Sequence, residues 1–559
     1  MKMTTTAAAL AAAVLSSVIL TGCADQSPRD YMFTGGRTSE PPVAPDVQAG
    51  WADDNAQYNY YLGYMERFKN VTAHKLDVSG RLIFAVLDAN GRPVHNCDVI
   101  FFGPDGNELA RRRTYADGRC MFFPHEAGQT MGPLTVHAHI GSSAVSLADL
   151  DLSAPQPAVR ELRLASARPA LQQVPLDVVF VLDTTGSMGA EIKKLKQTLS
   201  AIRYQVSMMT PAPDVRFGMV IYRDRGDEYV TKTFPFTADG EKLAAALLAV
   251  EAKGGGDYPE DVQEALRAAT ALKWRPEAVK LAFLVADAPP HLDYADEKFT
   301  YVDFMRWAAG AGVKMTTVGA SGLNDQGEYI FRQLAQYTMG LYVFLTRGEK
   351  GEASGDGAWT VSHHTGDNFE TANLDAIIVR AIARELSCLS DKPVAVPEDY
   401  FQARPREGVK DDAVLERLFA ECARQLVDFS QVKIEAGASA AVAPPKAEEG
   451  CTAAMAAALG DRLEAAVLAR KTFKLVEREQ IARLLAEIDL STAFSGGAAS
   501  APAPALREGR QVPARYIILS KVRKTAAGVD MYVKMVRTET GEVASATMLK
   551  IDAKLLTGS

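Results

Sequence analysis

Acidic and hydroxyl side chains gather where strands of the chain are expected to end. The run Val178–Leu182 is apolar throughout, which predicts a strand buried on both faces. It stops at Asp183, and Thr185 and Ser187 follow at alternate positions before a helical stretch begins. Three hard oxygen ligands directed at one point favour a divalent cation such as Mg²⁺ or Mn²⁺.

Two later segments supply further acids. Lys280–Ala286 predicts another buried strand, and Asp287 follows it directly. Between the two strands lies GGGDYPE, residues 254–260, which contains Asp257 and leads into an amphipathic helix. In an open parallel sheet, ligands bind at the carboxyl ends of the strands, so these acids should lie close together. The predicted metal ligands are Asp183, Thr185, Ser187, Asp257 and Asp287, with Mg²⁺ or Mn²⁺ as the expected ion and Ca²⁺ as a further candidate.

The three segments, in this order, resemble the von Willebrand factor A family. Its metal-dependent adhesion site has the form Asp-x-Ser/Thr-x-Ser, with a Thr or Asp from a second loop and an Asp from a third. The resemblance implies a doubly wound, Rossmann-like parallel α/β sheet over residues 174–390, ending in a helix at Leu374–Leu389. It also implies that Thr185 and Ser187 contact the metal directly. Asp257 stands where many members have Thr. A degenerate site, whose residues only cap helices, stays the alternative.

Residues 1–22, at the start of the chain, are predicted to be a targeting segment. Its apolar run, Ala7–Leu20, is too short and too rich in small residues to predict a membrane span. The run ends in LTGC, which resembles the bacterial lipobox and implies cleavage before Cys23 and lipidation of that residue. Several acyl chains would make a stable anchor. Ala24 rather than Asp follows, which favours the outer membrane, facing the periplasm. An ordinary secretory signal is the alternative.

The composition of the chain limits which classes of partner are expected. The 559 residues predict several domains, and the formal net charge is −8. Removal of residues 1–22 takes away Lys2 alone, which makes the charge −9. Nucleic acid is therefore not an expected partner, because no basic stripe is present. The one basic cluster, Arg111–Arg113, is predicted to be a solvated turn or strand edge.

The segment before the adhesion-like domain is rich in strand patterns. Residues 23–74 predict a tether and a packing helix at Tyr58–Phe68. Residues 75–168 contain VLDANGRPVHNCDVIFF and YADGRCMFFP, which resemble the carboxypeptidase-regulatory-like β-sandwich, a spacer or binding module. Cys97 and Cys120 lie in neighbouring predicted strands and form a candidate disulfide, with two buried thiols as the alternative.

The last part of the chain predicts a separate, smaller α/β domain at 438–559, after a linker and helix at 391–437. The helix at Met455–Leu468, a helix at Arg478–Ile488, the strand YIILS and a closing hairpin follow in order. This order resembles a periplasmic lipoprotein fold found in curli-secretion and flagellar outer-membrane lipoproteins and in activators of penicillin-binding proteins. It implies a partner-binding module without a catalytic motif, and self-association through this domain is a further expectation.

The sequence thus predicts a multidomain protein of the cell envelope: a β-sandwich, a doubly wound α/β domain and a smaller α/β domain on a lipid anchor. Its expected role is non-enzymatic, as a scaffold or adhesion and assembly factor that binds a carboxylate of a protein partner through the metal. One alternative is a metal-dependent hydrolase that uses the same acids with Glu260 and His291, although Glu260 is expected to cap a helix or face solvent and His291 to lie on a loop rim. The other is a structural lipoprotein with an inactive metal site.

Overall fold

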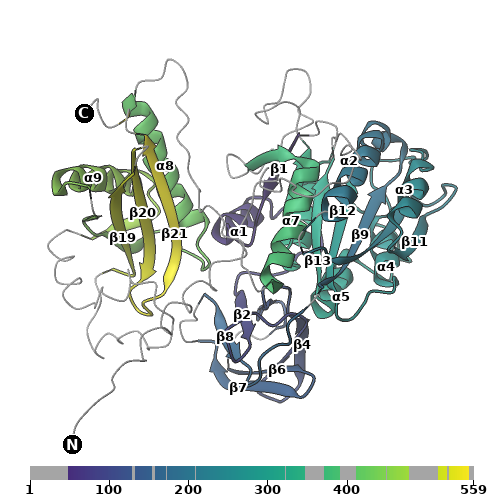
Figure 1. Cartoon of the computed structure of the whole chain (residues 1–559), viewed down its shortest axis with the longest axis horizontal. Coiled ribbons are helices and arrows are strands. Elements are labelled where there is room, and N and C mark those ends of the chain that lie inside the picture. The colour runs from purple at the N-terminus through teal and green to yellow at the C-terminus, as the bar shows by residue number, and fades with distance from the viewer. Residues whose placement is uncertain are drawn as a thin grey trace, which may run out of the picture. The chain divides into compact units, whose positions relative to one another are not determined.

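The computed structural model describes residues 48–390 and 411–552, together with Leu555. The gaps are residues 129–131, 154–157, 172, 208, 210, 321–322, 346–369, 449, 477–513 and 526–527. The described residues belong to two compact units, one containing Cys23–Pro397 and one containing Glu398–Ser559 (Figure 1). The predicted targeting segment, Cys23 and the helix expected at Arg478–Ile488 lie outside the described residues.

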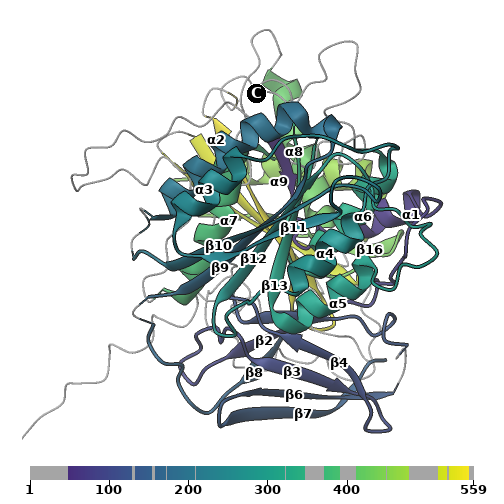
Figure 2. The ribbon, with the colours of Figure 1, turned by 90° about the vertical axis from the view of Figure 1, so that its right-hand side faces the viewer.

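An eight-stranded sheet lies at the centre of the first unit (Figure 2). Its strand order is β11-β10-β9-β12-β13-β14-β1-β15. The parallel strands are β9 (Pro175–Asp183), β10 (Asp214–Tyr222), β12 (Val279–Ala286), β13 (Val313–Gly319) and β14 (Tyr342–Leu345). Antiparallel pairing adds the strands β11 (Thr231–Thr237), β1 (Gln48–Ala52) and β15 (Glu370–Asn373). The predicted α/β fold is confirmed, but the sheet is mixed rather than wholly parallel.

Helices cover both faces of this sheet. One face carries α2 (Gly189–Ser207), α3 (Gly240–Leu248) and α7 (Leu374–Leu389). The other carries α1 (Tyr58–Arg67), α4 (Val262–Thr270), α5 (Tyr301–Ala311) and α6 (Asp325–Tyr337). In β9, Phe180 and Leu182 belong to the first core, whereas Val179 and Val181 belong to the second. The strand is apolar throughout because each of its faces packs against helices.

Strand β1, at the start of the described residues, belongs to the eight-stranded sheet. β1 pairs with β14 and β15, and Gly50 lies opposite Phe344. A β-carbon at Gly50 would lie 2.3 Å from the Phe344 ring, so only glycine leaves room for the ring. The packing helix expected at Tyr58–Phe68 is present as α1. The prediction that residues 23–74 otherwise form a tether is wrong for β1, because strand pairing with distant residues leaves no local pattern.

Two smaller sheets lie between α1 and β9 in the chain. The first contains β5 (Arg119–Phe122), β2 (Leu82–Leu87) and β8 (Arg160–Arg163). The second contains β4 (Glu108–Arg113), β3 (Asp98–Phe102), β6 (Pro133–Ile140) and β7 (Ser143–Asp151). The Phe101 ring lies 4.4 Å from Phe122 and 5.1 Å from Phe84, between ring centroids, so the two sheets share one core. The resemblance to the carboxypeptidase-regulatory-like family stays a prediction.

The candidate disulfide is not formed in the structure. Cys97 and Cys120 are free thiols, 0% and 1% exposed, in the shared core. Cys120 belongs to β5 of one sheet, whereas Cys97 precedes β3 of the other, so they are not on neighbouring strands as predicted. Burial raises the pKa of Cys97 to about 12. Both cysteines pack as small apolar side chains, which matches the alternative prediction of two buried thiols.

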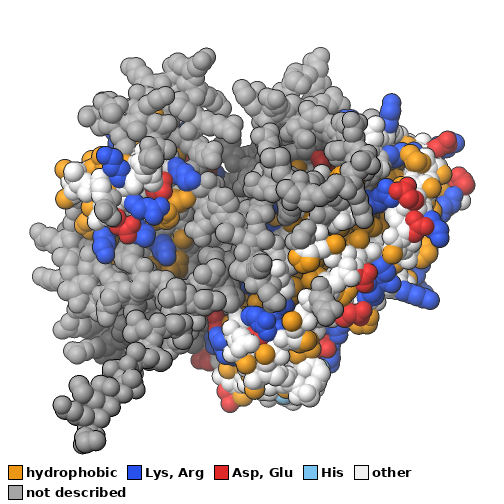
Figure 3. Space-filling model, viewed as in Figure 1, with side chains coloured by type: hydrophobic (Ala, Val, Ile, Leu, Met, Phe, Trp, Pro, Cys, Tyr) orange, Lys and Arg blue, Asp and Glu red, His pale blue; other side chains and the backbone are white. Residues whose placement is uncertain are grey.

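The basic cluster at Arg111–Arg113 lies on β4, an edge strand of its sheet, as predicted, but the cluster is not solvated throughout. Arg112 is 4% exposed, and its guanidinium donates to the hydroxyl of Tyr337, 2.7 Å away, at the end of α6. It also donates to the carbonyl oxygen of Met121, 3.1 Å away. Arg112 therefore joins the small sheets to a helix of the large sheet and is not solvated. On the face shown in Figure 3, acidic and basic side chains of the described residues are interspersed.

The second unit is a separate α/β body. Its sheet has the order β18-β16-β19-β20-β21, and β17 also pairs with β19. The strands are β16 (Ala438–Val442), β17 (Lys446–Ala447), β18 (Phe473–Leu475), β19 (Tyr516–Lys524), β20 (Gly528–Arg537) and β21 (Val543–Asp552). Helices α8 (Asp411–Asp428) and α9 (Ala453–Ala469) pack on it. The helix of the predicted linker 391–437 is thus α8, part of this unit's core.

No helix among the described residues combines the length and the apolar character needed to cross a bilayer.

Gly340, between α6 and β14, should be the least replaceable glycine of the large sheet. A β-carbon there would lie 1.8 Å from the carbonyl oxygen of Met315, a main-chain atom that cannot rotate away. We expect Gly340→Ala to destabilise the first unit by about 3 kcal/mol, as overpacking of a core does. Urea unfolding followed by tryptophan fluorescence isolates this unit, because all four tryptophans lie in it.

Gly63→Ala is the matched control. Gly63 lies in α1, and a β-carbon there would have nothing within 4 Å. The control should gain about 0.5–1 kcal/mol, the difference in helix propensity between alanine and glycine. Equal effects of the two substitutions would contradict the steric argument.

Candidate metal centre

The turn after β9 forms the first part of the candidate site. Asp183 is fully buried, and its Oδ1 accepts hydrogen bonds from the backbone nitrogen and the hydroxyl of Thr185, at 2.9 and 2.7 Å. The hydroxyl oxygens of Thr185 and Ser187 are 3.3 Å apart. A single turn of 3₁₀ helix at Gly186–Met188 leads into α2, which keeps the three side chains together. The structure thus brings the predicted Asp-x-Thr-x-Ser residues to one point.

Asp287, directly after β12, completes this group. Because β9 and β12 are adjacent parallel strands, both carboxylates lie at the same edge of the sheet. Ser187 hydrogen-bonds to Asp287, and burial raises the pKa of Asp287 above its ordinary value. Its Oδ1 is buried without a hydrogen-bond partner among the described residues.

The glycine run at 254–256 packs directly against this turn. Gly254 and Gly255 have φ angles of 80° and 75°, which favour glycine. The backbone nitrogen of Gly186 donates to the carbonyl oxygen of Gly254 over 3.0 Å. A β-carbon at Gly255 would lie 2.7 Å from Glu260 and 3.2 Å from Thr185. The glycines therefore allow close contact between the second loop and the Asp183 turn.

Glu260 lies inside the site, contrary to its predicted capping or solvent-facing place. Its side chain is buried, with 3% of the residue exposed, and its Oε2 has no hydrogen-bond partner within the described part of the chain. Burial and the surrounding carboxylates, Asp183 first among them, raise its pKa to about 9. The cap of α4 is the next residue, Asp261, whose Oδ1 accepts from the backbone nitrogen of Glu264 over 3.1 Å. The acids crowded after GGGDYP were a signal, but the sequence did not decide which of them points inward.

Among the described residues, no positively charged side chain contributes to the pKa shifts of Asp183, Asp287 and Glu260. Burial, and then repulsion from Asp287, raise the pKa of Asp183 to about 7. With Glu260, three buried carboxyl groups face one another, and two of their oxygens are without a hydrogen-bond partner among the described residues. A divalent cation would supply the missing positive charge, and the donors are carboxylate and hydroxyl oxygens. The residues therefore fit Mg²⁺ or Mn²⁺.

Asp257, the fifth predicted ligand, has a different neighbour. Its Oδ2 lies 3.6 Å from Nε2 of His291, and these two residues form one cluster with Asp224. The predicted place of His291 on a loop rim is wrong, because only 5% of it is exposed. Sequence reasoning assigned no role to Asp224. Asp224 lies just after the buried strand β10, as Asp287 lies just after β12 and Asp183 ends β9. This position at the end of a strand was the sequence signal that could have identified it.

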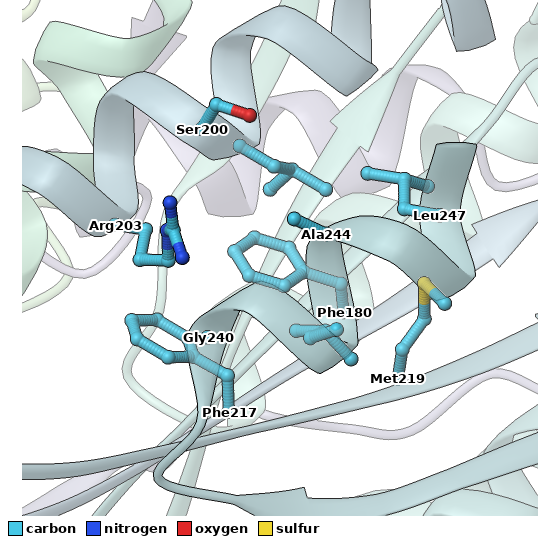
Figure 4. Close-up of a pocket in the computed structure, with 10 residues that line it drawn as sticks. Phe180, Ser200, Arg203, Phe217, Met219, Gly240, Ala244 and Leu247 are labelled. Carbon is cyan, nitrogen blue, oxygen red and sulfur yellow. The ribbon is translucent and has the colours of Figure 1, made fainter.

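A pocket elsewhere in this unit does not belong to the site. It lies between α2, α3 and the sheet, and its lining includes Phe180, Arg203, Phe217 and Leu247 (Figure 4). None of its lining residues belongs to the group around Asp183.

Comparison with known proteins gives the class of the domain. Residues 177–347 match the family model of the von Willebrand factor A domain. The first unit therefore contains a von Willebrand factor A domain, and the predicted resemblance is confirmed for this part of the chain.

The similar proteins match over short stretches. Alpha-protein kinase vwkA of Dictyostelium discoideum is 29% identical over 117 residues, which cover 21% of this chain and 19% of that protein. An ariadne-like RING finger protein of Acanthamoeba polyphaga mimivirus, R811, is 30% identical over 122 residues, covering 21% and 12%. The matched stretch thus spans less than a fifth of either relative. The solved structure of an aerotolerance-related membrane protein from Bacteroides fragilis shares 17% identity over 32% of this chain and 92% of that chain, with a TM-score of 0.23.

Proposed function

We propose that the von Willebrand factor A domain binds Mg²⁺ or Mn²⁺ through Asp183, Thr185, Ser187 and Asp287, and that the bound cation holds a carboxylate of a protein partner. Domains of this class commonly mediate adhesion between proteins. The proposal rests on one observation. The acids are buried together without a balancing positive charge, and Asp287 Oδ1 has no hydrogen-bond partner, among the described residues.

The surroundings of the group suit a partner. Ser187 and the loop 254–257 are exposed, so a cation at Asp183 would have one side open to solvent. Tyr258 is 42% exposed, and its hydroxyl donates to the carbonyl oxygen of Asp287 over 3.3 Å. Tyrosine beside a polar site is a frequent interface anchor, because it adds apolar contact at a small entropy cost. The partner's carboxylate would complete the coordination sphere.

The proposed setting is the cell envelope. A lipid anchor at Cys23 would hold the chain at a membrane, with the outer membrane as the expected one. The C-terminal unit would act as a second binding module or as a site of self-association. Tethering confines the chain and its partner to one surface, which raises their effective concentration.

Binding, rather than catalysis, is the proposed role. A metal-dependent hydrolase needs a positioned base and an open water position at the metal. His291, the base suggested by the sequence, lies with Asp224 and Asp257, and its Nδ1 is 2.8 Å from Asp293. The chain would therefore serve as a scaffold or an adhesion and assembly factor.

Ser187→Ala tests the cation-bridged mechanism. The full-length chain is freed of metal with EDTA and titrated with MgCl₂ in a calorimeter. It is then used to capture proteins from envelope extract with Mg²⁺ or with EDTA. We expect the substitution to weaken Mg²⁺ binding at least about tenfold, the effect that even an outer-shell ligand has on a metal site. Capture that depends on Mg²⁺ should be lost.

Ser200→Ala is the control. Ser200 also lies in α2, and its hydroxyl donates to the carbonyl oxygen of Lys196, 3.0 Å away, outside the site. Mg²⁺ binding and capture should both persist. If Ser187→Ala captures the same partners with and without EDTA, the domain has a structural role instead.

A further inference from the structure

A second group of ligand-type side chains lies beside the proposed adhesion site. Asp224 follows β10, Asp257 lies in the glycine-rich loop, and His291 follows β12 by five residues. One ligand atom from each of the three lies within 4.8 Å of the others. Nε2 of His291 is 3.7 Å from Oδ2 of Asp224 and 3.6 Å from Oδ2 of Asp257. Three loops that are far apart in the sequence therefore meet at one imidazole nitrogen.

The imidazole nitrogen lacks a hydrogen bond. The side chain of His291 is 5% exposed, and its Nε2 has no hydrogen-bond partner among the described residues. Its distances to the two carboxylates are too long for hydrogen bonds. They suit ligands that share a cation, because donors about 2.1 Å from a tetrahedral Zn²⁺ are roughly 3.4 Å apart.

Outer contacts hold the ligands in the orientation that a metal requires. Nδ1 of His291 is 2.8 Å from Oδ1 of Asp293, so this carboxylate favours a proton on Nδ1 and leaves the lone pair on Nε2. Oδ1 of Asp224 accepts a hydrogen bond from the hydroxyl of Tyr294 over 2.7 Å, while its Oδ2 faces His291. The Tyr294 ring also stacks on the imidazole, with centroids 4.1 Å apart. Metal-binding histidines are commonly backed by a carboxylate in this way.

We propose that Asp224, Asp257 and His291 form a second cation site, which takes a transition metal of the Zn²⁺ class and is separate from the site at Asp183. Imidazole suits Zn²⁺ and its neighbours, whereas Mg²⁺ and Ca²⁺ prefer oxygen ligands alone. Asp257, with 61% of its side chain exposed, leaves a fourth position open to water.

The second metal would brace the loop that carries Glu260. The backbone nitrogen of His291 donates to the carbonyl oxygen of Glu260 over 3.1 Å, and the backbone nitrogen of Glu260 donates to Pro289 over 3.0 Å. Asp257 precedes Glu260 in this loop, and His291 bonds to the backbone of Glu260 itself. A cation bound to both Asp257 and His291 would therefore fix the position of the loop around Glu260. The proposal does not depend on cation binding at Asp183.

Metal titration of the full-length chain tests the second site. After EDTA treatment, the chain is kept in excess MgCl₂ and titrated with ZnCl₂ by calorimetry, and with CoCl₂ by visible absorption. We expect one equivalent of Zn²⁺ to bind to this site in the presence of Mg²⁺, and the Co²⁺ form to show the absorption of a site with a nitrogen ligand. His291→Gln should weaken Zn²⁺ binding at least about tenfold, a lower limit set by outer-shell effects.

Two further variants make the result decisive. Asp257→Asn changes an exposed side chain and should fold normally, yet it should also weaken Zn²⁺ binding at least about tenfold. His125→Gln is the matched control, because His125 pairs with Asp77 at 3.3 Å, is 37% exposed and lies on another loop. Zn²⁺ binding should be unchanged in it.

Other outcomes would overturn the proposal. If the chain takes no equivalent of Zn²⁺ that both His291→Gln and Asp257→Asn weaken, His291 is not a metal ligand. Asp183→Asn separates this failure from failure of the adhesion site. It should abolish Mg²⁺ binding and leave Zn²⁺ binding intact.

Discussion

Asp183→Asn should abolish Mg²⁺ binding and at the same time stabilise the metal-free chain above neutral pH. The two effects have one cause, the burial of a carboxylate that has no positively charged partner among the described residues. Asp183 is fully buried, and burial with repulsion from Asp287 raises its pKa from 3.8 to about 7. Asparagine keeps an oxygen that accepts the two hydrogen bonds from Thr185 but carries no charge.

The sign of the pH dependence follows from the raised pKa. In the metal-free chain the folded state holds the Asp183 proton more tightly than the unfolded state does. Stability from this group is therefore complete below about pH 4 and is lost as the pH rises to about 7. Ionised Asp183 costs at most about 4 kcal/mol, so Asp183→Asn should gain up to that amount at pH 8 and nothing at low pH.

Metal affinity should change with pH in the opposite direction. A cation needs the ionised carboxylate, so Mg²⁺ affinity of the unmodified chain should fall about tenfold per pH unit below 7. Between pH 7 and 9 it should still rise, because Glu260 beside the site loses its proton at about 9. Urea unfolding in EDTA from pH 5 to 8, followed by tryptophan fluorescence, gives the stability. Calorimetry with MgCl₂ gives the affinity.

Asp239→Asn is the control for both measurements. Asp239 caps α3, accepting from the backbone nitrogens of Glu241 and Lys242, and asparagine is an equally good cap. Neither Mg²⁺ affinity nor the pH profile should change. A variant at Asp183 that binds Mg²⁺ as tightly as the unmodified chain would rule out this carboxylate as part of the site.

Asp54→Ala should be among the most destabilising substitutions in the first unit. Asp54 follows β1 closely and forms a two-point ion pair with Arg332 of α6, with 2.9 Å between Nε and Oδ2. The side chains are 1% and 0% exposed, and the guanidinium lies 4.1 Å from the centre of the Tyr64 ring. Removal of the carboxylate leaves a buried guanidinium without its main partner, which should cost about 3–5 kcal/mol.

The double variant Asp54→Ala/Arg332→Met tests the reason. If the loss of stability comes from the unpaired, buried charge of Arg332, removal of this arginine as well should recover part of the stability. An apolar side chain can replace a buried ion pair at little cost. Arg267→Met is the control: Arg267 pairs with Glu264 on the exposed side of α4, and such pairs contribute less than about 1 kcal/mol. Urea unfolding by tryptophan fluorescence measures all three. A double variant less stable than Asp54→Ala would contradict the explanation.

Local pattern in the sequence determined much of the domain. The unbroken apolar runs of β9 and β12 predicted strands buried on both faces, and the apolar stripe at Leu374–Leu389 predicted α7 with its observed ends. The Asp-x-Thr-x-Ser residues lie within five positions of one turn, so strand, turn and helix alone bring them together. Asp287 could be added because parallel neighbours end at one edge of the sheet.

Only the tertiary structure decided which acids share a neighbour. Asp257 and Glu260 lie three residues apart on one loop, yet Glu260 turns inward towards Asp183 and Asp257 faces His291. The contacts of that loop with Gly186 and Pro289, distant in the sequence, set these directions. The same holds for β1 and the Asp54–Arg332 pair, whose partners lie 278 or more residues away. Periodicity records which face of an element is buried, but the identity of the partner depends on how the whole chain packs.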